Sequence, residues 1–488
     1  MPESKAFNGP LEQVGPCRWR IPRSYRSDMR VDGIVYASDE LMASIKSDSS
    51  LDQVANVACL PGIVQASLAM PDIHWGYGFC IGGVAATDPE QGGVISPGGV
   101  GYDINCGVRL MRSDLQWYEV RERIPQLIDS LCAHIPAGVG GGGAVKFKRS
   151  ELQHILAEGS AYVVANGYGW DSDIEHTEAG GCIAGARPDF VSDRAYDRGA
   201  GQCGSLGAGN HFLEVQVVEE IFDAHAAEVF GLAVGQITFM IHSGSRGLGY
   251  QICEDALHEL RNVPTKYGIE LPDRQLVCAP VHSPEGGKYL GQMRAAANFA
   301  WANRQMIMHL TRQVVQQVFE TPAERLGLHL VYDVAHNIAK MEDYEVRGHV
   351  RRLCVHRKGA TRAFPPGHPD VPAKYRSVGQ PVLIPGDMGR ASFVLAGQPG
   401  SMTESFGSSC HGAGRVMSRG AAMRAAKGRS IHKELLSAGV YVRAHSRKGL
   451  DEEQPEAYKD VRQVVHVVQE AGISRIVARM RPVGVVKG

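Results

Sequence analysis

The stretch GGVGYDINCG at residues 98–107 carries the pattern from which we predict the fold. Within it, Asp103 and Cys106 lie three positions apart among glycines. Three more segments share a design in which a hydrophobic strand runs into a polar pair beside small residues: GAGNHFLE at 207–214, FMIHSGSRG at 239–247 and VYDVAHN at 331–337. Because α/β folds place their sites in loops at strand ends, this design predicts an α/β or α+β fold with its site there.

The same four segments carry the side chains of a metal centre. Asp103 and Cys106 are close enough in sequence to reach one ion, and imidazoles from the other segments would complete one or two coordination shells: His211, His242 and His336. Each histidine taken singly is more often an ordinary hydrogen-bonded residue, so the repeated pattern carries the prediction. Thiolate with imidazole favours zinc, whereas the carboxylate leaves manganese or iron open. A bridging thiolate would let these few ligands serve two ions.

Length and composition indicate a large globular protein. The chain has 488 residues and 58 glycines, which occur in short bursts between hydrophobic runs, so collagen and low-complexity disorder are excluded. No stretch approaches the roughly 18 apolar residues of a membrane span, and the polar start lacks a signal-peptide core. We therefore expect a cytoplasmic protein without a membrane partner. The eleven cysteines include no CxxC pair, which argues against a zinc ribbon or a disulfide framework.

The net charge of −1 conceals an uneven distribution. Residues 341–488 hold 24 Lys and Arg against 13 Asp and Glu, a net +11, which leaves −12 for residues 1–340. This split fits a polyanionic substrate held by the C-terminal third and a metal or acid/base site in the remainder. Mutual pairing of the two parts is an equally good explanation on charge alone.

The chain shows no fixed-period repeat and no long linker, which favours one intertwined unit. We expect residues 61–488 to form the catalytic domain, with residues 1–60 as an N-terminal segment of the same unit. Apolar spacing of three and four predicts helices at 119–134, 151–166, 294–319, 415–437 and 460–471. Short β-branched runs predict strands at 236–241, 328–334, 381–384 and 392–395. The proline-rich stretch 362–379 is predicted to be a loop.

A fifth segment, SFGSSCHGAGRVMSR at 405–419, is predicted to bind phosphate. Its glycines let backbone N–H groups approach an anion, and a helix starting near Arg415 would point its positive end there. Arg415 and Arg419 are four apart, so on that helix they would share a face and grip successive phosphates. His411 could be a base, a metal ligand or a nucleophile on phosphorus. A structural turn that caps the helix is the alternative.

These segments together resemble the RtcB-type RNA-splicing ligases. The resemblance extends over residues 70–488 and adds MPDIH at 70–74, VHRKGATR at 355–362 and the terminal PVGVVKG at 482–488. It implies one large domain with central β-sheets surrounded by helices and a dinuclear metal cleft. It also implies a GTP- and Mn²⁺-dependent ligase that joins RNA 3′-phosphate or 2′,3′-cyclic phosphate ends to 5′-hydroxyl ends. An archease-type activator is a further expected partner.

The resemblance also assigns roles to residues. Cys106 would bridge two Mn²⁺ ions, Asp103 and His211 would complete one site, and His242 and His336 the other. His411 would attack the α-phosphate of GTP and carry GMP. Contacts to the nucleotide are implied for Asn210, Phe212, Glu214, Asn337, Pro385, Gly386, Asp387, Met388, Ser392, Ala413, Gly414, Tyr458 and Lys487. Glu214 suits guanine, whose N1–H and N2 amine are donors. Asp387 departs from the serine expected in the family and adds a negative charge near the nucleotide.

Two other functions fit part of the pattern. A dinuclear metal-dependent phosphodiesterase or phosphatase acting on RNA ends would share the metal ligands and use His411 as a ligand or proton donor, without any nucleotide. A non-catalytic RNA-binding scaffold would explain the basic third of the chain but not the histidines. Labelling with GTP separates the three.

Overall fold

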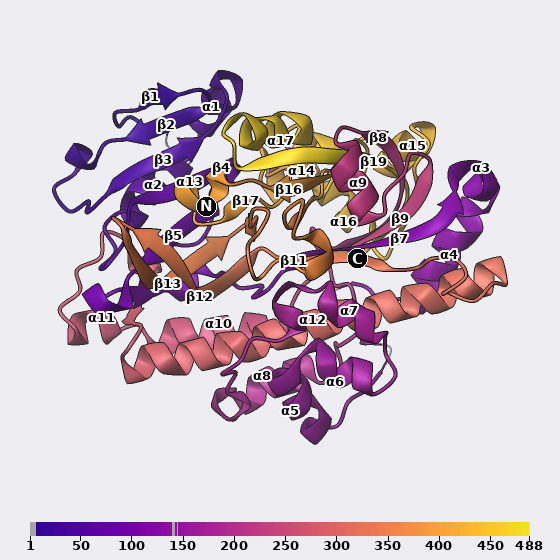
Figure 1. Cartoon of the computed structure of the whole chain (residues 1–488), viewed down its shortest axis with the longest axis horizontal. Helices are drawn as coiled ribbons and strands as arrows, with labels where there is room; N and C mark the ends of the chain where they lie inside the picture. Colours follow the sequence, from indigo (N-terminus) through magenta and orange to yellow (C-terminus); the bar gives the residue numbers. More distant parts are fainter. Residues whose placement is uncertain (1–5, 139–141, 144) are drawn as a thin grey trace.

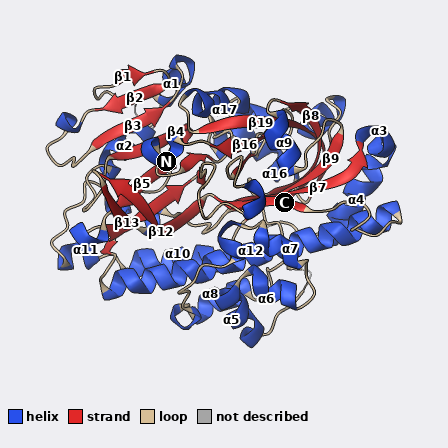
Figure 2. Ribbon diagram, in the orientation of Figure 1, coloured by secondary structure: helices blue, strands red, loops and turns tan. Residues whose placement is uncertain are grey.

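The computed structural model describes residues 6–138, 142–143 and 145–488. Within this part of the chain two large β-sheets lie side by side, with helices around them (Figures 1 and 2). The fold is therefore α/β in composition, with central sheets surrounded by helices, as predicted. Among the described residues, no helix has the length and apolar character needed to span a bilayer.

The first sheet is mostly antiparallel and joins the N-terminal segment to the middle of the chain. In spatial order its strands are β1 Glu12–Gly15, β2 Arg18–Ile21, β3 Asp32–Tyr36, β4 Ala66–His74, β5 Ile81–Thr87, β13 His349–Lys358 and β12 Asn337–Val346. β3 pairs parallel to β4, and the helices α1 Asp39–Ile45 and α2 Ser50–Val57 connect them. Residues before 60 thus share a sheet with strands that reach the site.

The second sheet brings together the strands whose ends carry the predicted ligands. Its order is β11 Leu330–Ala335, β7 Gly107–Gln116, β9 Gln236–Ser243, β8 Phe212–Ile221, β19 Ser474–Lys487, β16 Ser392–Gly397 and β15 Pro381–Ile384, with β18 Tyr441–Ala444 beside β19. Two short pairs complete the strands: β6 Val94–Ile95 with β10 Ala279–Pro280, and β14 Ala360–Arg362 with β17 Ser408–Cys410.

One helix, α12 Pro284–Phe319, runs below both sheets along the length of the molecule (Figure 1). Ser283 caps its first turn by accepting from the Gly286 N–H, and Pro284 fits the first turn because it needs no N–H partner. Most of its residues are buried, including Asn298, Asn303 and Arg304. α12 is therefore an internal support and not a surface helix.

Other helices cover the flanks of the sheets. Those near α12 are α4 Ile124–His134, α5 Arg149–Glu158, α6 Ser160–Ala165, α7 Asp171–Glu175, α8 Asp193–Gly199, α10 Arg246–Glu259 and α11 Val263–Lys266. The remainder are α3 Trp117–Val120, α9 Ala224–Phe230, α13 Gly400–Glu404, α14 Arg419–Ala425, α15 Ile431–Ser437, α16 Arg447–Glu452 and α17 Val461–Glu470.

The element predictions hold best where the apolar pattern is uninterrupted. α12 and α17 confirm the helices predicted at 294–319 and 460–471, and all four predicted strands lie within or overlap β9, β11, β15 and β16. Two predicted helices are broken. A 3-10 turn separates α3 from α4 where Pro125 opens the second helix, and Gly159, at φ 61°, separates α5 from α6.

The helix predicted at 415–437 is also broken, since α14 ends at Ala425 and α15 begins at Ile431, and it is wrong at its start. Arg415 pairs as an isolated β-bridge with Tyr458, and the N–H groups of Val416 and Met417 donate to the Ala457 carbonyl. These backbone bonds keep 415–417 out of the helix. The helix begins only at Arg419 after the Ser418 cap, so Arg415 and Arg419 do not share a helix face.

Candidate active site

The five predicted metal ligands meet at the same end of four adjacent strands of the second sheet. Cys106 immediately precedes β7, His242 lies near the end of β9, His336 separates β11 from β12, and His211 immediately precedes β8. Since β11, β7, β9 and β8 are neighbours in that order, their ends bring these side chains together. Asp103 joins them from the turn before Cys106.

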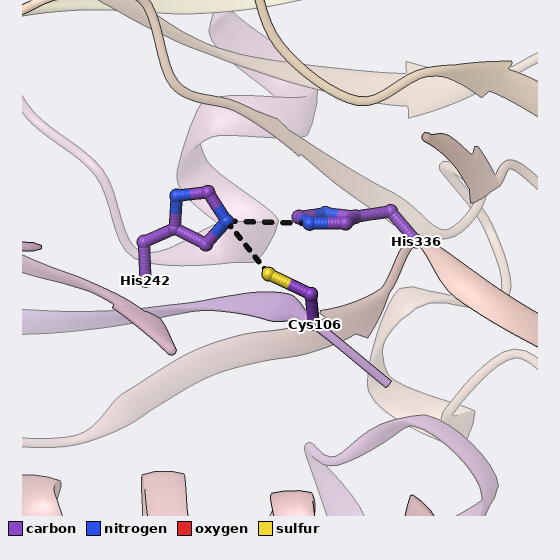
Figure 3. A group of neighbouring side chains, drawn as sticks. All are labelled: Cys106, His242 and His336. Carbon is purple, nitrogen blue, oxygen red and sulfur yellow. Dashed lines mark hydrogen bonds between the residues drawn. The ribbon is translucent and has the colours of Figure 1, made fainter. Parts of the chain in front are cut away.

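The ligand atoms form two groups that share one sulfur. The carboxylate group comprises Asp103, Cys106 and His211, and the two-histidine group comprises Cys106, His242 and His336. Cys106 Sγ lies 3.4 Å from His211 Nε2 and 3.2 Å from His242 Nε2, while His242 Nε2 lies 3.2 Å from His336 Nε2. In Figure 3 the three side chains of the two-histidine group point toward one another. A shared sulfur between two groups is the arrangement expected of a bridged pair of ions.

Burial controls the protonation of this cluster. It lowers the pKa of His242 and of His336 well below the usual value, so both imidazoles are neutral and able to ligate. Burial, followed by the nearby Asp103 carboxylate, raises the pKa of the Cys106 thiol well above normal. Without a cation the thiol would therefore stay protonated. A bound metal ion would reverse this, because a coordinated thiol loses its proton.

His411 lies beside the two-histidine group, with its ring centroid 5.0 Å from that of His336. It directly follows β17, and Asp72 of β4 holds it from behind. The Asp72 carboxylate accepts from His411 Nδ1 at 2.5 Å and from the His411 backbone N–H at 2.9 Å. With the proton on Nδ1, the Nε2 lone pair of His411 is free to act as a nucleophile.

Asp72 is fully buried, which makes its charge state important. Burial acts to raise the pKa of Asp72, but the charge and hydrogen bonds of His411 outweigh it, and the pKa lies below the usual range. The buried Lys459 ammonium donates to the carbonyls of Pro71 and Ile73 on either side. Asp72 is thus an ionised, rigidly held partner for His411.

A pocket opens in front of His411 and contains most residues predicted to contact a nucleotide. Its lining includes Asn210, Phe212, Glu214, Asn337, Pro385, Gly386, Asp387, Met388, Ala413, Gly414, Arg415, Arg419, Tyr458 and Lys487, together with Cys106, His242, His336 and His411. Ser392 lies behind the wall, where its hydroxyl accepts from Gln216 Nε2 and from the Gly386 N–H. Asp103 and His211 are outside the lining.

Glu214 and Lys487 face the pocket from neighbouring strands, β8 and β19. Burial raises the pKa of Glu214 to about 7 and lowers the pKa of Lys487. Gln216 Nε2 donates to the Glu214 carboxylate at 2.8 Å and fixes its orientation. Glu214 and Lys487 therefore offer a hydrogen-bond acceptor and a hydrogen-bond donor to the pocket at buried positions.

Asp387, the departure from the expected serine, has its charge offset within the protein. Its carboxylate accepts from the Gly389 N–H at 3.0 Å and lies 3.2 Å from the Arg390 guanidinium. Burial nevertheless raises its pKa to about 6. Burial thus favours the neutral acid form of Asp387, and the Arg390 guanidinium offsets the charge of the carboxylate when it is ionised.

Arg415 and Arg419 occupy different environments. Arg415 Nη1 donates to Glu453 at 3.0 Å and to the Tyr458 hydroxyl at 3.2 Å, and its side chain is only 17% exposed. Arg419 is 57% exposed and lies 3.6 Å from Glu453. Arg415 is consequently part of the pocket wall, whereas Arg419 stands at its mouth.

Sequence reasoning gave no role to several residues that complete the site. His74, Ile81 and Glu453 line the pocket, and Asp72 and Lys459 support His411. A signal existed for Asp72, because a carboxylate inside the apolar strand that ends at His74 must have a buried partner. Glu453 lies in a run of exposed-looking charges and had no such signal.

Comparisons with known proteins give one consistent result. A family model described as tRNA-splicing ligase RtcB matches residues 53–488. The chain is 56% identical to a tRNA-splicing ligase RtcB of Thermococcus kodakarensis, over 98% of this chain and 99% of that protein. It is 53% identical to the same-named protein of Archaeoglobus fulgidus, over 99% and 100%. It is 52% identical to an RNA-splicing ligase RtcB of Mycobacterium tuberculosis, over 89% and 100%.

Proposed function

We infer the function from one premise: this chain belongs to the RtcB family of tRNA-splicing ligases. We propose that it joins RNA ending in a 3′-phosphate or 2′,3′-cyclic phosphate to RNA with a 5′-hydroxyl, at the expense of GTP. The observation that carries the proposal is the placement of His411. Its Nδ1 is bound to Asp72, which leaves Nε2 for a pocket that also contains Glu214 and Lys487.

The proposed reaction has three balanced transfers. His411 Nε2 attacks the α-phosphorus of GTP, an N–P bond forms, and the bond to the β-phosphate breaks to release pyrophosphate. An RNA 3′-phosphate oxygen then displaces His411 and takes GMP, which gives an RNA-ppG end. Finally the 5′-hydroxyl attacks the RNA 3′-phosphorus, loses its proton and expels GMP. A 2′,3′-cyclic end must first be opened by water to the 3′-phosphate.

The residues of the two ligand groups fit a pair of manganese ions. The donors are one thiol, three imidazoles and one carboxylate, converging within 4.8 Å in each group, and the buried Nδ1 of His336 has no hydrogen-bond partner among the described residues. When bound, two such ions would neutralise phosphate charge and favour in-line displacement. Asp103 and His211 would hold one ion, His242 and His336 the other, with Cys106 between them.

Selection of guanine is proposed for Glu214 and Lys487. A carboxylate accepts from guanine N1–H and the N2 amine, and an ammonium donates to O6 or N7. Adenine offers an acceptor at N1 and an amine in place of O6, so both contacts would fail. Arg419, exposed at the mouth, is proposed to contact RNA phosphates. An archease-type activator remains an expected partner.

Incubation with α-labelled GTP and Mn²⁺ tests the proposal. A ligase of this mechanism should acquire an acid-labile, hydroxylamine-sensitive label, which RNA with a 3′-phosphate then discharges. A metal-dependent phosphodiesterase, the second candidate because it would use the same ligands, should open a cyclic phosphate with no label at all. Full end-processing activity in an enzyme that never becomes labelled would contradict the proposal.

A further inference from the structure

We propose that two adjacent residues of α12 each position the ligands of a different metal group: Asn303 orients the carboxylate group, and Arg304 orients the two-histidine group. Both side chains are fully buried. Neither lines the pocket, so each would act through other residues. The inference rests on the proposed function in so far as the two groups hold two ions.

Arg304 contacts three ligand-bearing segments at once. Its Nη1 donates to the Asn105 carbonyl at 2.7 Å and to the Ser243 carbonyl at 3.0 Å. Its Nε and Nη2 each donate to an oxygen of Asp333 at 2.8 Å. Asn105 immediately precedes one ligand of the two-histidine group, Ser243 immediately follows the second, and Asp333 lies three residues before the third. One planar guanidinium therefore fixes the backbone beside Cys106 and His242 and the Asp333 side chain on the strand that leads to His336.

The backbone at Asn105 explains why this hold is needed. Asn105 has a φ of 52°, in the left-handed region that non-glycine residues seldom adopt. Its amide oxygen accepts from Arg304 Nη2 at 3.0 Å, and its amide nitrogen donates to the Ala297 carbonyl of α12 at 2.7 Å. The turn that presents Cys106 is thus bound to the helix through both its main chain and its side chain.

Asn303 serves the other group by an equivalent set of bonds. Its amide oxygen accepts from the N–H groups of Gly204 and Ser205 at 2.8 and 3.1 Å, and its amide nitrogen donates to the carbonyls of Ser205 and Gly244 at 3.2 and 3.1 Å. It therefore joins the 204–206 loop to the turn at Gly244.

Both of these segments orient ligands of the carboxylate group. The Leu206 carbonyl accepts from His211 Nδ1 at 2.9 Å, which directs His211 Nε2 at the ion position. The Ser245 N–H, next to Gly244, donates to Asp103 Oδ1 at 3.1 Å. Asn303 Nδ2 also donates to the Ser243 hydroxyl at 3.0 Å, but Arg304 holds the Ser243 carbonyl independently. Loss of Asn303 should therefore release His211 and Asp103 and leave His242 and His336 in place.

α12 also provides matched controls. Asn298 is equally buried, but its amide bonds to the carbonyls of Leu156 and Ala157. Arg312 is a buried arginine with a bidentate bond to Asp173, at 2.7 Å for both contacts. These residues have the same chemistry and the same helix but no contact with a ligand segment. Replacement of Asn298 or Arg312 should lower the free energy of unfolding without moving the metal ligands.

The test compares Asn303→Ala with Asn298→Ala and Arg304→Lys with Arg312→Lys. Mn²⁺ binding to metal-free protein is measured by calorimetry, and electron paramagnetic resonance separates a coupled pair from a single ion. Asn303→Ala should bind one ion normally and the other about 10–100-fold more weakly, as is typical when a partner of a metal ligand is lost. Arg304→Lys should weaken the ion of the two-histidine group by the same factor and the other ion less, because the turn that Arg304 holds presents the shared Cys106. Each control should bind two ions with unchanged affinity, even where its thermal midpoint falls.

Double variants identify the ion that remains. When His211→Ala is added to Asn303→Ala, the protein should still bind one ion, whereas adding His336→Ala should remove that ion. With Arg304→Lys, adding His336→Ala should leave one ion bound and adding His211→Ala should remove it. Equal weakening of both ions, or equal losses in the controls, would overturn the inference. If Arg304→Lys does not fold, the Asn303 series decides the question by itself. A wild-type protein that binds fewer than two ions would instead contradict the proposed function.

Discussion

The two halves of the proposed active site, called here the metal half and the nucleotide half after their proposed ligands, are built by different means. The metal half consists of ligands at the ends of adjacent strands, buried and bound through main-chain groups to α12. The nucleotide half draws on separate segments, and ion pairs such as Arg415 with Glu453 hold its wall. Substitutions in the metal half should therefore slow every step of the proposed reaction. Substitutions in the nucleotide half should slow single steps or change the selectivity for GTP over ATP.

His411→Ala should give the largest separation between the halves. We expect covalent guanylylation and ligation to fall by about 10⁴-fold or more, because the imidazole nitrogen that the Asp72 bond leaves available for attack is lost. Both Mn²⁺ ions should still bind, since no ligand changes. Label incorporation and metal content measure the two effects. A GMP adduct on the variant would refute the assignment.

Cys106→Ser should abolish the function of the metal half as a whole. A hydroxyl is a poor bridging ligand compared with a thiolate, so both ions should weaken together and activity should fall by roughly 10³-fold. Elemental analysis after dialysis provides the measurement. Full occupancy by two ions would mean that the sulfur is not shared.

Lys487→Met should affect selectivity and leave the metals bound. The variant keeps a side chain of similar length but removes the ammonium, which lies 5.8 Å from the centre of the Phe212 ring and close enough to Glu214 to act on its carboxylate. Guanylylation should therefore fall about 10²-fold. The ratio of GTP to ATP labelling should fall with it. Unchanged discrimination would place the guanine elsewhere.

The pH profile should show a smaller effect. Because burial raises the pKa of Glu214 to about 7, the side chain is mostly a carboxylate at pH 8 and mostly a carboxylic acid at pH 6. Only the carboxylate accepts from guanine, so the KM for GTP should rise about tenfold as the pH falls over this range. Lys487 and Asp387 are the charged groups that face it. Glu214→Gln should flatten the profile.

The two arginines should give the smallest contrast. Arg419→Ala should slow RNA joining a few-fold at low salt and leave GTP loading unchanged, because an exposed cation contributes mainly to phosphate binding. Arg415→Ala should instead impair loading, because Arg415 supports Tyr458 and Glu453 in the wall. Equal losses in both steps for Arg419→Ala would place it on the triphosphate.

Sequence patterns predicted the metal half better than the nucleotide half. Cys106, His211, His242 and His336 each stand at a strand end, and strand ends are visible in hydrophobic patterning, so their meeting could be expected from one repeated design. The long helix α12 was predicted over most of its length. Its polar residues Asn303 and Arg304 carried no signal, because a buried hydrogen bond across the fold leaves no local pattern.

The region after His411 shows the limit of local reasoning. Residues 415–418 were predicted to be helical, yet main-chain bonds to Ala457 and the bridge to Tyr458 keep 415–417 out of the helix. These partners are about forty residues away, so no short-range pattern could report them. Glu453 was missed for the same reason: its role depends on Arg415, which reaches it only in the folded chain.

The shared sulfur of Cys106 also affects which metal the protein captures. Thiolate and imidazole donors bind divalent ions in the order that rises from manganese to copper, with zinc also above manganese. The same five donors would consequently hold zinc more tightly than the ion proposed for activity. Occupancy in a cell would then depend on the free concentrations of competing metals, and protein purified from a zinc-rich medium should be fully folded, fully loaded and slow.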